Sequence, residues 1–141
     1  MGPEEMRMME LWLEGYGCAQ ILALLDLEAD GKQNPDLVRA VSGLQGGLGF
    51  AGKVCGALSG GACVLARHGG RGAEGEHEDT HLGAMIRNLV AWFDAEIGAR
   101  HGGIDCSVIL ENDPNNRLSR CPAIVSEVHA KVRELLASRQ A

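Results

Sequence analysis

Aromatic residues are scarce in this 141-residue chain, which has two tryptophans, two phenylalanines and one tyrosine. Packing must therefore depend on aliphatic side chains, which are plentiful because 45% of the residues are hydrophobic. Basic residues are also in deficit, since 13 Lys and Arg face 19 Asp and Glu for a net charge of -6. This balance argues against nucleic acid or an anionic membrane surface as the main partner.

Long apolar runs are absent as well. No stretch approaches the ~18 residues that a membrane span needs, and the N-terminal segment lacks the basic region of a secretory signal. The sequence therefore predicts a cytoplasmic protein with no membrane contact and a single domain over residues 1–141. In that compartment the five cysteines are more often reactive or metal-binding than joined in structural disulfides.

No segment alternates apolar and polar residues as a half-buried strand does, so the predicted fold is all-α. Prolines, glycines and apolar spacing predict a compact bundle of five to seven helices. The expected helices cover about residues 3–13, 18–30, 35–42, 53–67, 82–97 and 106–110, with a last helix that Ser119 or Cys121 caps and that runs to about residue 136.

Small residues dominate the stretch Gly52–Val64, which contains two cysteines. Residues with little side chain let a bound group or another backbone approach closely, so the stretch is either a ligand site or a tight helix crossing. The preceding glycine-rich segment Gly43–Gly52 contains a formal GxGxxG. A helix rather than a strand is predicted before it, which favours a flexible connector over a dinucleotide site.

Four cysteines each follow a glycine or turn signal at or near the start of a predicted helix: Cys18, Cys55, Cys106 and Cys121. Unpaired N–H groups and the macrodipole favour an anion there, so the pKa of a thiol falls and the thiol becomes nucleophilic or ready to bind a metal. The alternative is that each cysteine is a small buried hydrophobe. Cys55 is expected to be the most reactive, because Lys53 lies two residues before it.

Cys63 differs from the other four because it lies in the middle of a predicted helix, where a buried thiol has a raised pKa and reacts slowly. On a continuous helix it is roughly 12 Å from Cys55, beyond the ~7 Å limit for a disulfide between Cα atoms. No CxxC motif occurs, so local spacing gives neither a thioredoxin-like dithiol nor a ferredoxin or zinc-ribbon pattern. Any pairing must come from tertiary structure.

The cysteine segments resemble those of the C-GCAxxG-C-C family of proteins described as redox-active, small chains defined by four cysteines and a CGAxxG motif. Here the motif is Cys55–Gly60, and the other three segments are Gly15–Gln20, Gly102–Cys106 and Arg120–Pro122. The resemblance extends from Glu14 to the last helix and brings no substrate with it. Cys63 lies outside the four-cysteine pattern.

The first functional hypothesis is therefore a cytoplasmic thiol redox or electron-transfer protein. Its four cysteines would converge as dithiol pairs or as thiolate ligands to a metal or an iron–sulfur cluster, with Cys63 a less favoured ligand. The partner would be a redox protein or a small thiol or disulfide. The sequence does not distinguish an enzyme from an electron carrier.

A competing motif is HExxH, which His77–His81 matches. On a helix this spacing places His77 and His81 on one face for zinc and offers Glu78 as the general base of a metallohydrolase, with Glu96 as a candidate third ligand. The motif lies in an acid-rich stretch at a predicted helix start, whereas a zinc hydrolase carries it within a helix. A solvated helix start is the favoured interpretation, and a zinc hydrolase is the alternative function.

Overall fold

The structure is a computed structural model that describes residues 2–139. Within this range it consists of α-helices with no strand, which confirms the all-α prediction. The helices are α1 (Pro3–Leu13), α2 (Cys18–Ala29), α3 (Pro35–Val41), α4 (Gly56–Gly69), α5 (Leu82–Phe93), α6 (Ala99–His101), α7 (Cys106–Ile109) and α8 (Arg117–Ser138). A π-helical turn, Asp94–Gly98, joins α5 to α6 without a break, and short 3-10 turns lie at Ser42–Leu44 and Pro114–Asn116.

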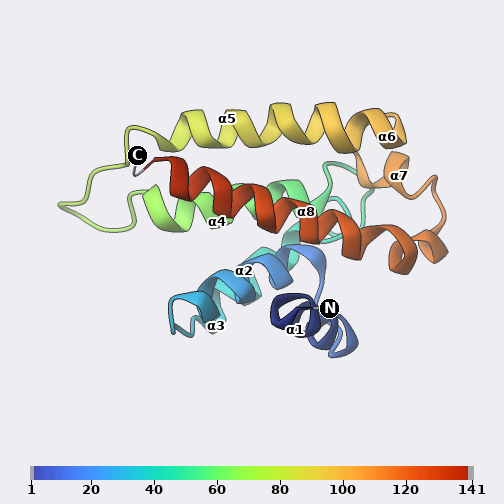
Figure 1. Cartoon of the computed structure of the whole chain (residues 1–141), viewed down its shortest axis with the longest axis horizontal. Coiled ribbons are helices and arrows are strands. Elements are labelled where there is room, and N and C mark those ends of the chain that lie inside the picture. The colour runs from blue at the N-terminus through green and yellow to red at the C-terminus, as the bar shows by residue number, and fades with distance from the viewer. Residues whose placement is uncertain (1, 140–141) are drawn as a thin grey trace.

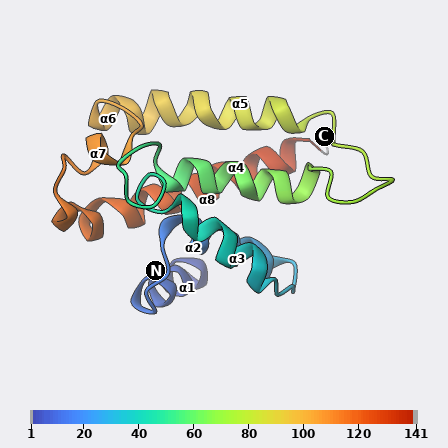
Figure 2. The same ribbon diagram turned by 180° about the vertical axis from the view of Figure 1, so that it is seen from behind.

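Helices α2, α4 and α8 form the centre of the molecule and contact one another. All three begin at the end of the molecule that carries α7 and run toward the long loop between α4 and α5 (Figure 1). Helix α5 runs antiparallel to α4 and α8 on one side of them. Helices α1 and α3 lie beside α2, on the side of α4 and α8 that is away from α5 (Figure 1). The view from behind shows the same arrangement (Figure 2).

The core contains mainly aliphatic side chains, as the scarcity of aromatic residues requires. Its largest fully buried members are Phe93, Leu11, Ile21, Leu22, Leu65, Leu89, Ile97, Ile109, Ile124, Val125, Val128 and Val132. Helix α5 buries the face that its three- and four-residue spacing predicts. No helix within residues 2–139 combines the length and the apolar character needed to span a membrane.

Local signals explain most helix starts. Asn34 Oδ1 accepts a hydrogen bond from the Leu37 N–H at 3.1 Å, which caps α3 ahead of Pro35. The Gln20 side chain plays a related part at the start of α2, where its Oε1 accepts from the Gly17 N–H at 3.1 Å. These caps satisfy N–H groups that have no partner inside the helix.

Two helix boundaries differ from the prediction. Helix α4 begins at Gly56 rather than Lys53, because residues 53–55 are extended and form backbone hydrogen bonds with residues 104–106. Helix α8 begins at Arg117, before both expected caps, so Pro122 lies within the helix. Proline there removes one hydrogen bond, to the carbonyl of Leu118, and that residue is 79% exposed, so water can take the place of the lost donor.

Candidate functional site: a cavity lined by four cysteines

One cavity of about 240 Å³, at the end where α2, α4 and α8 begin, brings together the four cysteines predicted as site residues. They are Cys18, Cys55, Cys106 and Cys121, and all are free thiols. Each comes from a different segment of the chain, so the convergence is a product of tertiary folding. Cys63 does not line this cavity and packs instead beside a small apolar cluster of Ala19, Ala23 and Val41.

Cys55 and Cys106 are neighbours because two extended segments pair just before α4 and α7. The Cys55 N–H donates to the Ile104 carbonyl at 3.0 Å, and the Cys106 N–H donates to the Lys53 carbonyl at 2.6 Å. Val54 and Asp105 form the antiparallel bridge between these bonds. The pairing holds the start of α7 against the start of α4 and fixes the two cysteines on adjacent strands of backbone.

Gly56 brings Cys18 to the same place. A Cβ atom at Gly56 would lie 2.6 Å from the Cys18 sulfur and 2.8 Å from the Leu44 carbonyl oxygen, so only glycine leaves room for that thiol. Gly60, four residues later in the motif, has a different role, because its Cβ would lie 2.8 Å from the Ala19 Cα. The small-residue stretch therefore makes room for a site thiol at Gly56 and for the α2–α4 crossing at Gly60.

The glycine-rich loop before α4 is a bonded turn rather than the expected flexible connector. Five consecutive residues, Gly46–Phe50, have positive φ and form one left-handed turn. The Gly52 N–H donates to the Gly46 carbonyl at 3.0 Å, and Gln45 Nε2 donates to Gln20 Oε1 at 2.6 Å, which ties the loop to α2. Leu48 and Phe50 adopt φ values of 68° and 63°, a conformation that strains residues other than glycine.

Burial controls the acidity of the thiols. It raises the pKa of Cys55, which is 8% exposed, to about 12, and the N–H groups of Ala57 and Leu58 at the start of α4 lower it by a smaller amount. Burial likewise raises the pKa of Cys18. The prediction that a helix start lowers the pKa of Cys55 is therefore wrong. Lys53 does not help, because its side chain is exposed.

Cys121 lies in the second turn of α8 rather than at its first residue, so it gains little from the helix end. Burial raises the pKa of Cys121 to about 11, and the positive charge of Arg117 opposes this shift only weakly. The pKa of Cys63 is also raised by burial, as its mid-helix position predicts. In the metal-free protein these thiols are protonated near neutral pH.

The rim of the cavity contains residues that the sequence did not single out. Trp12, Tyr16 and Phe50 line it with Arg117, whose guanidinium carbon lies 4.9 Å from the centre of the Phe50 ring. The buried Trp12 indole N–H has no hydrogen-bond acceptor within residues 2–139. Because these residues come from α1, the α1–α2 turn, the glycine-rich loop and α8, no local pattern could have shown that they share one rim.

A comparison with protein families matches residues 16–135 to the family described as "Putative redox-active protein (C_GCAxxG_C_C)". The chain belongs to the C-GCAxxG-C-C family. The match contains all four of these cysteines and confirms the resemblance seen in the sequence. A search of curated proteins and a search of solved structures each found no match. Membership supports a redox-active protein and gives no support to a zinc hydrolase.

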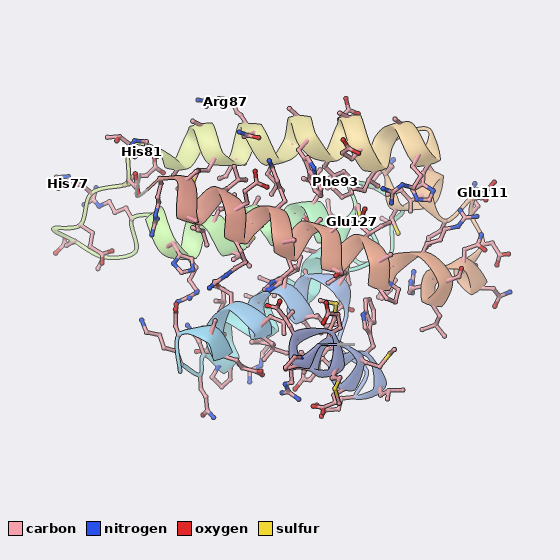
Figure 3. All side chains as sticks on the ribbon, viewed as in Figure 1. His77, His81, Arg87, Phe93, Glu111 and Glu127 are labelled. Carbon is pink, nitrogen blue, oxygen red and sulfur yellow. The ribbon has the colours of Figure 1, made fainter. Side chains whose placement is uncertain are left out.

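The HExxH motif lies apart from the cavity of this C-GCAxxG-C-C protein. His77–His81 is an exposed loop that ends where α5 begins, so its two histidines do not share a helix face. Figure 3 shows His77 and His81 beside the α4–α5 loop, at the opposite end of the molecule from Glu111 and α7. The helical zinc site predicted from this motif is therefore not formed, and Glu96, exposed in the π-helical turn, does not complete it.

A cluster that resembles a metal site joins α2 to α4 near their far ends. Ligand atoms of Asp26, Asp30 and His68 all lie within 4.8 Å of one another. Arg67, however, forms ion pairs with both carboxylates, so a guanidinium already supplies the positive charge that a metal ion would bring. The family motif includes none of these residues, and the cluster is best described as an ion-pair network.

Proposed function

We propose that this chain is a thiol redox protein in which Cys18, Cys55, Cys106 and Cys121 accept and release electrons by forming and opening disulfides inside the cavity. The observation that carries the proposal is the convergence of four free cysteines from four separate segments on one cavity. A chain that used cysteine only as a small apolar residue would not need to gather them. The expected partner is a redox protein or a small disulfide, in a reducing compartment such as the cytoplasm.

Cys106 is the thiol that we assign to the first step. It is only partly buried, and it lines both the cysteine cavity and a neighbouring cavity of about 330 Å³. Cys55, in contrast, is buried and has a raised pKa, which slows its attack on a disulfide. The structure therefore favours Cys106 over Cys55 as the most reactive thiol.

The reaction consists of two successive thiol–disulfide exchanges. The Cys106 thiolate attacks one sulfur of a disulfide, forms a mixed disulfide and releases the other sulfur as a thiol. The charge of Cys106 acts on the Cys18 thiol, so the two cysteines are near one another. Cys18 then attacks the Cys106 sulfur of the mixed disulfide, releases the second substrate sulfur as a thiol and forms the Cys106–Cys18 disulfide. The protein loses two electrons and two protons, and the substrate disulfide gains them as two thiols.

A thiolate-bound iron–sulfur cluster is a second candidate, because four cysteines are more than one dithiol needs. Gly56 leaves space beside Cys18, and the Gly46 N–H lies against the Cys18 sulfur, as suits a buried thiolate ligand. Within residues 2–139 no three cysteine sulfurs lie within 4.8 Å of one another. Sulfurs around one tetrahedral zinc would be about 3.8 Å apart, so a larger cluster fits these four donors better than a single zinc ion. A cluster would supply one-electron transfer.

Anaerobic purification tests the two forms of the proposal together. The thiol form predicts a colourless, metal-free protein with five titratable thiols, and addition of a small disulfide should reduce that number by two or four. The cluster form predicts bound iron, inorganic sulfide and visible absorption that Cys→Ser changes at the four cavity cysteines abolish. A protein with no iron whose cavity thiols never become oxidised would contradict both forms.

Glu78→Gln serves as the control for the hydrolase alternative. Glu78 is exposed and remote from the cavity, so the variant should keep the thiol count and any absorption of the parent protein. A zinc-dependent hydrolase would instead lose its reaction with this one change. Loss of thiol chemistry in this variant would count against the cavity as the redox site.

A further inference from the structure

Arg117 is half-buried, and its guanidinium pairs with no acidic residue among those that the structure describes. Its side chain makes no hydrogen bond and no ion pair within residues 2–139, whereas Arg120, one turn later in α8, pairs with Glu111 at 2.6 Å. Arg117 lines both the cysteine cavity and the neighbouring cavity, together with Gly46, Phe50 and Cys106. An unpaired arginine is thus held at the wall that the two cavities share.

Phe50 helps to hold the guanidinium in place. The ring lies 4.9 Å from the Arg117 Cζ, a distance at which a cation is attracted to an aromatic face. Phe50 is 60% exposed and has a φ of 63°, so burial does not explain why a large apolar residue occupies a strained position. Strain of this kind accompanies functional sites more often than ordinary surface loops.

We propose that Arg117, supported by Phe50, is a recognition site for a carboxylate group of the substrate, and that the cysteine cavity therefore selects anionic thiols and disulfides. This inference rests on the thiol form of the proposed function and adds a substrate class to it. Arginine suits the role because its planar guanidinium can form two parallel hydrogen bonds to a carboxylate while its face stays on an aromatic ring. Cys106, at the same wall, would meet the sulfur of a substrate held in this way.

The charges around Arg117 permit such binding in a protein whose net charge is -6. The first turn of the 22-residue helix α8 adds the partial positive charge of its N–H groups. Asp113 is the acidic residue that lines the neighbouring cavity, and its carboxylate is exposed and accepts the Asn115 N–H at 3.0 Å. Glu111 is occupied by Arg120. A substrate carboxylate therefore competes with no ion pair at Arg117.

Two alkylating reagents of nearly the same size, one anionic and one neutral, test the site without any redox reaction. Iodoacetate carries a carboxylate and iodoacetamide is neutral, so the ratio of their rates at Cys106 reports the local charge and cancels differences in access. In reduced, metal-free protein the iodoacetate-to-iodoacetamide ratio should fall on Arg117→Gln by up to about fivefold, which is what one unit charge at about 4 Å contributes in water. Arg117→Lys should retain most of the ratio, since it keeps the charge.

Arg87→Gln is the matched control. Arg87 also has no ion pair within residues 2–139, but it lies exposed on α5 and lines neither cavity. Figure 3 shows it on the outer side of that helix. Its removal changes the net charge by the same amount and should leave the Cys106 ratio unchanged. An equal ratio in the parent protein and Arg117→Gln, or an equal fall in Arg87→Gln, would overturn the inference.

Three small disulfides then separate failure of the inference from failure of the proposed function. Oxidised glutathione is anionic, hydroxyethyl disulfide is neutral and cystamine is cationic. We expect the reduced protein to react fastest with oxidised glutathione and Arg117→Gln to lose that preference. Reaction with all three at similar rates would refute anion selection and leave the thiol function intact. Reaction with none of them would refute the thiol function, and the alkylation ratio would still decide whether Arg117 attracts anions.

Discussion

Helices α2, α4 and α8 gather cysteines at the end where they begin and charged side chains toward the end where they finish. At the first end, Cys18, Cys55 and Cys121 meet Cys106 around a cavity whose lining residues form no ion pair in the described part of the chain. Toward the other end, the carboxylate of Asp26 is 1% exposed and contacts basic side chains from two helices. Its partners are Arg67 at 2.5 Å, His68 at 2.8 Å and Arg133 at 3.3 Å.

This contrast shows how one bundle separates stability from reactivity. Two arginines and a histidine surround the buried Asp26 carboxylate, so a network of ion pairs and hydrogen bonds holds this end of the bundle together. The cysteine end has no such network within residues 2–139, and burial raises the pKa of Cys55 and Cys121. A redox group needs that freedom, because its sulfur atoms must change partners during the reaction.

Asp26→Ala should produce the largest loss of stability. The change leaves two arginines and a histidine close together without their common carboxylate, and removal of one member of a buried ion pair typically destabilises a protein by about 3–5 kcal/mol. Urea unfolding would measure the free energy. Asp36→Ala is the control, because its ion pair with Arg39 is exposed and should contribute within about 0.5 kcal/mol. Equal effects would show that the Asp26 network does not hold the bundle together.

The cysteine end should give a stability that falls at high pH. Folding raises the pKa of Cys55 from 9.0 to about 12, so above pH 9 the unfolded chain loses this proton while the folded protein keeps it. The free energy of unfolding in reduced, metal-free protein should be fully retained below pH 9 and fall between pH 9 and 12, by at most about 1.4 kcal/mol per pH unit for this thiol.

Because other groups titrate in the same range, the measurement is the difference between the parent protein and Cys55→Ala in urea unfolding at several pH values. The parent should lose stability faster than the variant above pH 9. Parallel curves would mean that the Cys55 thiol is not protonated preferentially in the folded state.

Much of the cysteine end could be predicted from the sequence. Helix starts at Cys18 and Cys106 follow from local glycine and turn signals, and the CGAxxG motif marks the segment that contains Cys55. The raised pKa values of Cys18, Cys55 and Cys121 could not be predicted, because the helix start is a local feature and burial depends on the whole fold. The left-handed loop and the position of Arg117 beside it depend on tertiary contacts for the same reason.

The zinc site predicted from the HExxH motif is not formed, because two local hydrogen bonds to Asp79 place the helix start after the motif. Asp79 Oδ1 accepts the His81 N–H at 2.8 Å, and the Asp79 carbonyl accepts the Leu82 N–H at 3.0 Å. A short acidic side chain that bonds to nearby backbone competes with helix formation. Helix α5 consequently starts after the second histidine, and a motif defined by helical spacing has no helix on which to act.

Gly60→Ala should have a moderate effect on stability. It would also show how strongly the α2–α4 crossing affects the cysteine end of the bundle. Alanine gains about 1 kcal/mol of helix propensity over glycine, but its Cβ would lie 2.8 Å from the Ala19 Cα, and such overpacking costs about 1–3 kcal/mol. We expect a net loss of up to about 2 kcal/mol in urea unfolding, with a shift of α2 that changes the alkylation rate of Cys18.

Gly83→Ala is the matched control in α5. Its Cβ would meet only the flexible end of the Arg87 side chain, at 3.1 Å, so that side chain can move aside. The propensity gain should then dominate and stabilise the protein. If both variants gained stability, the α2–α4 crossing would not need glycine at position 60.

Cys63→Ala should have the smallest effect and would show whether the site contains four thiols or five. Cys63 is half-buried and its sulfur lines neither cavity at the cysteine end. Removing one partly buried sulfur atom should reduce stability by less than about 1 kcal/mol. The number of thiols lost on reaction with a disulfide, or the amount of bound iron, should match that of the parent protein, whereas Cys106→Ala should lower it. Because Cys63 and Cys55 lie on the same helix, an equal loss in Cys63→Ala would mean that α4 opens near Gly60 and Gly61 to bring the fifth thiol into the cavity.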